Sequence, residues 1–114
     1  MTGVGRALTE RERAVLDAML SVDFDGVDGL RREAEQATVV GGCGCGCPSI
    51  DFYKQVGAGM RVRVNAATPG HFDGLFLYTV GGRLGGIEWV GSPEEGNPPE
   101  FPDPSTFTIM PALP

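Results

Sequence analysis

The sequence contains few of the side chains that most often carry metal, redox or proton-transfer chemistry. Its 114 residues include one histidine, one tryptophan and three cysteines. An odd number of cysteines excludes a closed set of intramolecular disulfides. No apolar run approaches the roughly 18 residues that a membrane span needs, and residues 1–9 lack the apolar region of a secretory signal. We therefore expect a reduced, cytoplasmic protein that does not associate with membranes.

Basic residues are also scarce. Lysine and arginine together number 9 against 15 aspartates and glutamates, which gives a formal net charge of −6. Nucleic acids and anionic lipids are bound through basic patches, so we predict neither as a partner. The acidic balance instead favours a basic partner protein. The length, with 41% hydrophobic and 21% charged residues, indicates one domain spanning 1–114.

Residues 1–37 are predicted to form a pair of amphipathic helices. Thr9 followed by Glu12 is a capping box, which predicts a helix over 9–21. A second helix is predicted over 25–37, with its charged residues, Arg31 among them, pointing outward. The apolar positions that recur at helical spacing are Val15, Leu16, Met19 and Leu20 in the first helix, and Val27, Leu30, Ala34 and Ala37 in the second.

From residue 38 to residue 91 the pattern changes to the period of two that is typical of strands. Alternation over 60–66 predicts a half-buried strand, and the apolar run 75–80 predicts a central strand covered on both faces. Gly81-Gly82 predicts a two-residue hairpin turn, because glycine adopts positive φ without steric cost. A simple count across that turn places Phe76 opposite Ile87.

The resulting fold class is α+β: two amino-terminal helices packed on an antiparallel sheet of three to five strands. Proline is frequent after Ser92, so residues 92–114 are predicted to form an extended, partly anchored tail without regular structure.

All three cysteines lie in one glycine-rich segment, at alternate positions. In an extended chain Cys43, Cys45 and Cys47 would point to the same face. Zinc requires about four ligands in a tetrahedron, so this row is one ligand short. His71, Asp51 or a second chain would have to supply the fourth ligand. The candidate metal site is therefore Cys43, Cys45, Cys47 and His71, with zinc as the ion.

Two alternatives need no metal or other cofactor. Cysteine behaves as a small buried hydrophobe, so the segment can simply allow close packing beneath the helices. A thiol-redox or nucleophilic role is the other, with Cys45 as nucleophile and His71 as base.

The chain also resembles a family of small uncharacterised bacterial proteins. The resemblance lies in three segments: residues 12–24, the run Cys45-Gly46-Cys47-Pro48-Ser49-Ile50, and residues 82–88 with the later Pro102-Asp103-Pro104. No activity is established for that family, so the resemblance implies no mechanism. Among proteins that place a helical pair on a small antiparallel sheet are toxin-neutralising immunity proteins, an analogy of fold alone. The function expected is a small non-enzymatic binding module; the alternative is a metal- or thiol-dependent protein.

Overall fold

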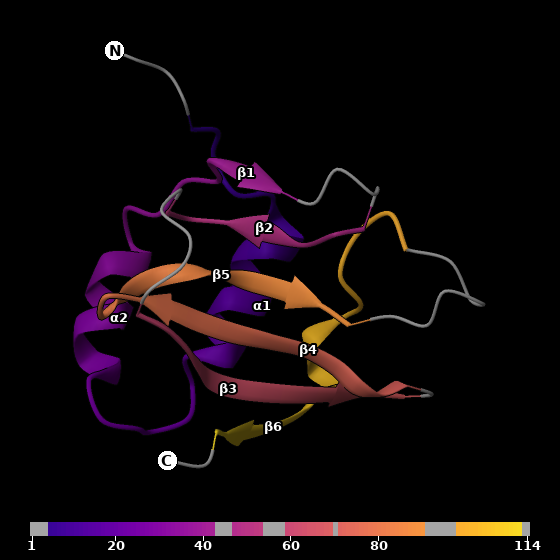
Figure 1. Ribbon diagram of the computed structural model, residues 1–114. Helices are drawn as coiled ribbons and strands as arrows, with labels where there is room; N and C mark the ends of the chain where they lie inside the picture. The colour runs from indigo at the N-terminus through magenta and orange to yellow at the C-terminus, as the bar shows by residue number, and fades with distance from the viewer. Residues whose placement is uncertain (1–4, 43–46, 54–58, 70, 91–97, 113–114) are drawn as a thin grey trace.

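Figure 1 shows the computed structural model, which describes residues 5–42, 47–53, 59–69, 71–90 and 98–112, with the backbone alone at 71–73. Two helices lie against one face of a six-stranded antiparallel sheet with the order β1-β2-β5-β4-β3-β6. The elements are α1 (Glu10–Met19), α2 (Val27–Ala34), β1 (Gly41–Gly42), β2 (Ile50–Asp51), β3 (Met60–Thr68), β4 (His71–Val80), β5 (Arg83–Trp89) and β6 (Thr108–Pro111), with a 3-10 turn at Pro104–Thr106. The predicted α+β class is confirmed, but the sheet has six strands instead of the predicted three to five, because residues 108–111 add an edge strand. Within the described residues, no helix is long and apolar enough to cross a membrane.

The first helix begins where its capping box predicts. The Thr9 hydroxyl accepts a hydrogen bond from the Glu12 amide at 3.1 Å, and the Glu12 carboxylate accepts one from the Thr9 amide at 2.9 Å. Two amides that have no partner within the helix are thereby satisfied. The second helix is shorter than predicted: it begins at Val27, after Gly26 in the left-handed region, and ends at Ala34.

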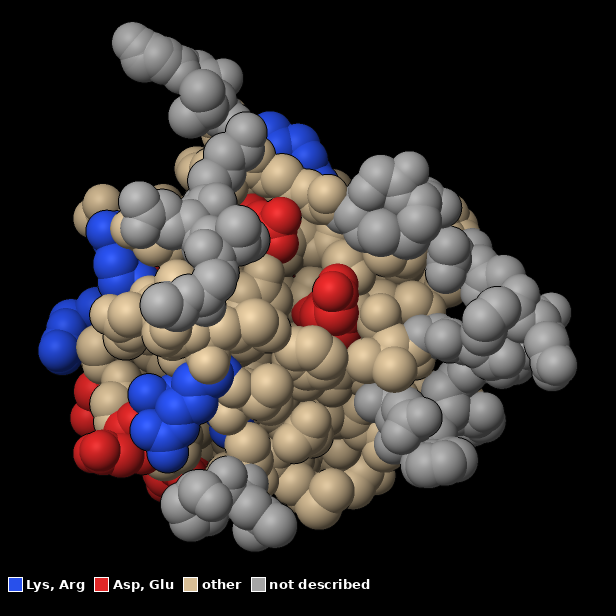
Figure 2. All heavy atoms as spheres, in the orientation of Figure 1, with Lys and Arg blue, Asp and Glu red and all other residues tan. Residues whose placement is uncertain are grey.

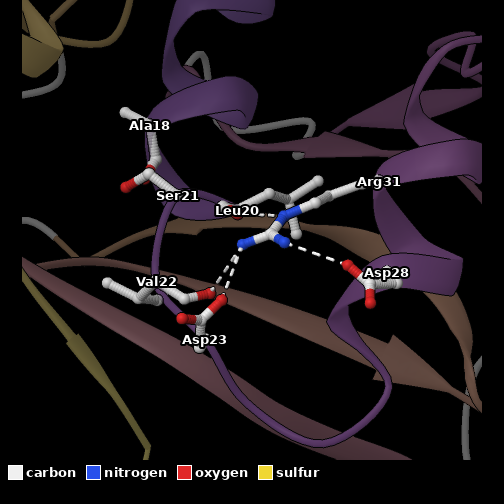
Figure 3. Close-up of polar contacts among 7 residues, drawn as sticks. All are labelled: Ala18, Leu20, Ser21, Val22, Asp23, Asp28 and Arg31. Atoms are coloured by element: carbon white, nitrogen blue, oxygen red, sulfur yellow. Dashed lines mark hydrogen bonds and ion pairs between the residues drawn. The ribbon is translucent and has the colours of Figure 1, made fainter.

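Arg31 joins the two helices instead of pointing outward, which corrects the prediction made for it. Figure 3 shows its side chain extending from α2 to the link after α1. Its Nε donates to the Leu20 carbonyl at 2.8 Å and one terminal nitrogen donates to the Val22 carbonyl at 3.4 Å. The guanidinium also pairs with Asp28 at 3.0 Å and Asp23 at 3.2 Å. Arg31 thus satisfies the carbonyl of Leu20, the C-cap of α1, which the helix itself leaves without a donor, and one carbonyl of the link beyond it.

The β4–β5 hairpin occupies the middle of the sheet and turns at Gly81-Gly82, whose φ values of 58° and 84° confirm the predicted turn. The register predicted for it is wrong by one residue. Ile87 pairs with Leu77, not with Phe76, because Gly85 is an extra residue in β5 between the Thr79–Leu84 and Tyr78–Gly86 pairs. Such a bulge shifts every later pair by one position.

The prediction that residues 75–80 are covered on both faces is also wrong. Leu75 and Leu77 are fully buried against the helices, whereas Phe76 and Tyr78 lie on the opposite face and are only half-buried. The fully or almost fully buried side chains of the core include Val15, Leu16, Met19, Val64, Leu75, Leu77, Leu84, Ile87 and Phe101.

The carboxyl-terminal segment contributes more structure than its prolines predict. Phe101 is 1% exposed, and Thr108–Pro111 form the edge strand β6 beside β3. The Ala112 amide donates to the Arg63 carbonyl at 2.8 Å, so by alternation the backbone of Pro111 faces away from β3. Proline has no N–H to offer there, which explains how it can sit in a strand at the sheet edge.

Candidate functional site

The structure describes only part of the predicted cysteine–histidine site. Cys43 and Cys45 lie outside the described residues, as does the side chain of His71. Cys47 is described and is half-buried. Among the side chains that are described, no group of three or more His, Cys, Asp or Glu residues lies close enough to hold a metal ion. The metal site remains a prediction.

The topology brings the backbones of Cys47 and His71 to the same end of the sheet. β2 runs antiparallel to β5, and β5 runs antiparallel to β4. The segment that enters β2 and the residue that opens β4 therefore lie at one end, on either side of the end of β5.

The Cys47 thiol donates a hydrogen bond to the Ser49 hydroxyl at 3.3 Å. Ser49 is buried, and its hydroxyl oxygen also accepts from the Trp89 amide at 2.8 Å. Ser49 thus joins the start of β2 to the end of β5 through its side chain. For Cys47 this arrangement supports the packing interpretation, since the thiol belongs to a structural hydrogen-bond chain.

A cavity of about 350 Å³ lies beside this thiol. Its lining residues are Arg6, Thr9, Glu12, Cys47, Pro48, Ser49, Ile50, Pro99, Glu100 and Phe101. Arg6 donates two hydrogen bonds to the Glu12 carboxylate, at 2.8 and 2.9 Å. This contact with Arg6, together with the Thr9 amide, lowers the pKa of Glu12 below its ordinary value. Both charges are engaged with each other at the helix start, so the cavity wall is held together by a structural ion pair.

The larger candidate is the face of the sheet opposite the helices, which no helix of the described residues covers and which we call the uncovered face. We define it by six side chains that the registers place opposite the helices: Asp51, Val62, Asn65, Phe76, Tyr78 and Glu88. Exposed Met110 of β6 pairs with Asn65 and extends this face to the edge of the sheet. Figure 2 views the molecule from this side: two separate acidic spots lie near its middle, and basic side chains lie toward the left and at the top. The two carboxylates therefore lie among uncharged groups, with Arg83 at one end of the face, where it pairs with Val80.

Tyr78 occupies the centre of the uncovered face and crosses over β5. A Cβ built on Gly85 would lie 2.5 Å from the Tyr78 ring, and one on Gly86 would lie 2.6 Å from its hydroxyl oxygen. The two glycines therefore leave the space that the ring fills. The hydroxyl donates to the Asp51 carboxylate at 2.8 Å. Partial burial raises the pKa of Tyr78, and the negative charges of Asp51 and Glu88 raise it further.

Phe76 lies next to Tyr78 on the same face. The two ring centroids are 6.2 Å apart with the planes inclined by 57°, a tilted arrangement typical of favourable aromatic pairs. Phe76 also pairs across the strands with Glu88. The uncovered face thus combines two adjacent aromatic rings with the carboxylates of Asp51 and Glu88.

Sequence reasoning missed this face, although the sequence contains its signal. Phe76 and Tyr78 alternate with Leu75 and Leu77, and Glu88 separates Ile87 from Trp89. An unbroken apolar run conceals that alternation, because aromatic residues are apolar enough for either environment. The charged side chain of Glu88 is the stronger indication that one face of the sheet is exposed to solvent.

No family model, curated protein or solved structure matches this chain. The resemblance to small bacterial proteins therefore remains a prediction, and function is argued from the residues of the site alone.

Proposed function

We propose that the protein is a small non-enzymatic binding module that engages a basic partner protein through the uncovered face of its sheet. The observation that carries the proposal is this face itself, where two half-buried aromatic rings lie beside two carboxylates. Apolar surface supplies the area that a protein interface buries, and aromatic residues are enriched at such interfaces.

Charge complementarity favours a basic partner over other proteins. The chain has a net charge of −6, and Asp51 and Glu88 on the uncovered face are both acidic. A partner surface bearing arginine or lysine would neutralise these carboxylates and would be attracted from a distance. Met110, with an exposed fraction of 54%, would add apolar contact at the edge.

A random peptide library displayed on phage and panned against the immobilised protein tests the proposal. We expect the retained sequences to be enriched in arginine and lysine relative to the input library. A Met110→Arg variant places a positive charge on the uncovered face at an exposed position, so it should retain those sequences at least about tenfold more weakly.

Gln36→Arg is the matched control because it adds the same charge at an exposed position after α2, on the helical side of the molecule. It should retain the selected sequences as the wild-type protein does. Equal loss in both variants, or selected sequences without basic enrichment, would contradict the proposed function.

A further inference from the structure

The uncovered face offers more than general negative charge, because two carboxylates lie near one aromatic ring. Asp51 pairs with Gly86 on one side of β5 and Tyr78 pairs with Gly86 on the other. Gly86 has no side chain, so the Tyr78 ring extends over it and its hydroxyl reaches Asp51 at 2.8 Å. A carboxylate is thus held in a fixed position at the hydroxyl end of the ring.

Glu88 is the second carboxylate near the ring. It lies two residues beyond Gly86 on β5, on the same face of the sheet. Asp51 and Glu88 are therefore diagonal neighbours, a relation that separates Cα atoms by about 7–8 Å. Both carboxylates act on the Tyr78 hydroxyl electrostatically, since the negative charge of each raises its pKa. The two carboxylates are close enough for one charged group of a ligand to contact both.

We infer that the Tyr78 ring, with the carboxylates of Asp51 and Glu88 near it, is the recognition point for an arginine side chain of the partner protein. This inference rests on the proposed function and names the group that the uncovered face would recognise. A guanidinium is planar, so it can stack on a tyrosine ring while its N–H groups donate sideways to carboxylates. The second oxygen of Asp51 and the carboxylate of Glu88 are the acceptors.

The chain makes a contact of the same kind with its own residues. The guanidinium carbon of Arg83 lies 5.0 Å from the centroid of the Tyr53 ring, and Arg83 Nε lies 3.8 Å from the Glu33 carboxylate. Arginine there combines a ring with a carboxylate. At Tyr78 the ring has two carboxylates beside it, which favours a guanidinium with its five donors over the compact ammonium of lysine.

Three capped pentapeptides test the inference, each with glycine at every position except the third, which is arginine, lysine or citrulline. Citrulline has the shape of arginine without its charge. Titrated into the isotope-labelled protein, the arginine peptide should shift the amide signals of Tyr78, Gly86 and Glu88 saturably. The lysine peptide should bind more weakly, and the citrulline peptide should leave these signals unchanged.

Variants locate the effect. Glu88→Gln and Asp51→Asn should each weaken arginine-peptide binding by about tenfold, the loss expected for a hydrogen bond to a charged group. Asparagine still offers an oxygen to the Tyr78 hydroxyl, so the fold around the ring is kept. Glu35→Gln on the exposed surface after α2 removes the same charge and should have no effect.

Equal shifts from arginine and citrulline, equal binding of arginine and lysine, or no saturable shift at the peptide's solubility limit would each overturn the inference. So would unchanged binding by Glu88→Gln. The two proposals fail separately. If display still selects basic sequences that Met110→Arg rejects, the proposed function stands and only the arginine site is wrong.

Discussion

At the scale of single residues, two glycines illustrate opposite demands on the backbone. Gly82 has φ of 84° in the β4–β5 turn, a conformation that a β-branched residue resists. Gly29 lies within α2 without positive φ, and a Cβ there would meet no atom within 4 Å. Only the first position requires glycine.

Replacing Gly82 with valine should therefore lower the free energy of unfolding by more than about 1 kcal/mol. Replacing Gly29 with alanine should raise it by about 0.5–1 kcal/mol, because alanine is the better helix former and restricts the unfolded chain. Urea denaturation of both variants measures the two changes. Destabilisation by both, or by neither, would contradict the turn and helix assignments.

Glu12 is expected to make stability depend on pH. Its pKa is lowered in the folded protein by the Arg6 guanidinium and the Thr9 amide. A lowered folded-state pKa contributes stability that is present above the unfolded-state pKa and is lost as pH falls through the folded-state pKa. Glu12→Gln should cost about 1 kcal/mol at neutral pH and should reduce the loss of stability on acidification.

Glu10→Gln is the control for this experiment, since Glu10 is an exposed residue of the same helical turn. Both variants remove one carboxylate near the helix start. Urea denaturation at neutral and acidic pH should distinguish them. A wild-type pH dependence that survives Glu12→Gln would show that the Arg6–Glu12 pair does not hold the helix start.

At the scale of elements, Arg31 is the main described contact between the helix link and α2. Because the Asp23 and Asp28 side chains are 94% and 81% exposed, their ion pairs add little stability. The hydrogen bonds to the carbonyls of Leu20, which caps α1, and of Val22 in the link matter more.

Arg31→Ala should lower the free energy of unfolding by about 1–2 kcal/mol, the range for hydrogen bonds to a charged donor at a partly exposed site. Arg31→Lys should recover little of the loss, because an ammonium cannot reach several acceptors in one plane. Thermal or urea melts of these variants beside Arg32→Ala, a change at an exposed neighbour, provide the comparison. A loss from Arg32→Ala as large as that from Arg31→Ala would contradict this role.

How far the sequence predicts these elements depends on the range of the signal. The capping box of Thr9 and Glu12 and the turn at Gly81-Gly82 are local, and both are confirmed. The bulge at Gly85 has no such local signal, and the space beside Gly85 is filled by the Tyr78 ring of the neighbouring strand. A count across the turn cannot include it, so the predicted pairing of Phe76 with Ile87 is one residue out.

The same distinction applies to the sheet edge and to the candidate site. Strand β6 forms because Thr108–Pro111 pair with β3, some forty residues earlier in the chain. The proline content of this segment predicts no strand. Which side chains form the uncovered face likewise depends on the side of the sheet against which the helices pack. The sequence grouped Cys47 with Cys43 and Cys45 in one candidate segment, but it could not reveal Ser49 as the hydrogen-bond partner of Cys47.

At the scale of the whole molecule, the metal interpretation of Cys43, Cys45, Cys47 and His71 has a direct test. We expect the protein purified under reducing conditions to melt at the same temperature with and without a chelator, because the Cys47 thiol already belongs to a structural hydrogen-bond chain. Melting curves and elemental analysis of the same sample check this. Stoichiometric zinc, with a chelator-sensitive melting temperature that Cys45→Ser removes, would contradict it and support the metal site.

The most direct test of the proposed binding function is to map where a selected basic sequence binds. A display-selected peptide titrated into the isotope-labelled protein should shift the amides of Asp51, Gly86, Glu88 and Asn65 on the uncovered face, and the shifts should weaken as salt is added. The exposed amides of α1 and α2 should stay unchanged. Shifts centred on the helices, or on the cavity beside Cys47, would contradict the account.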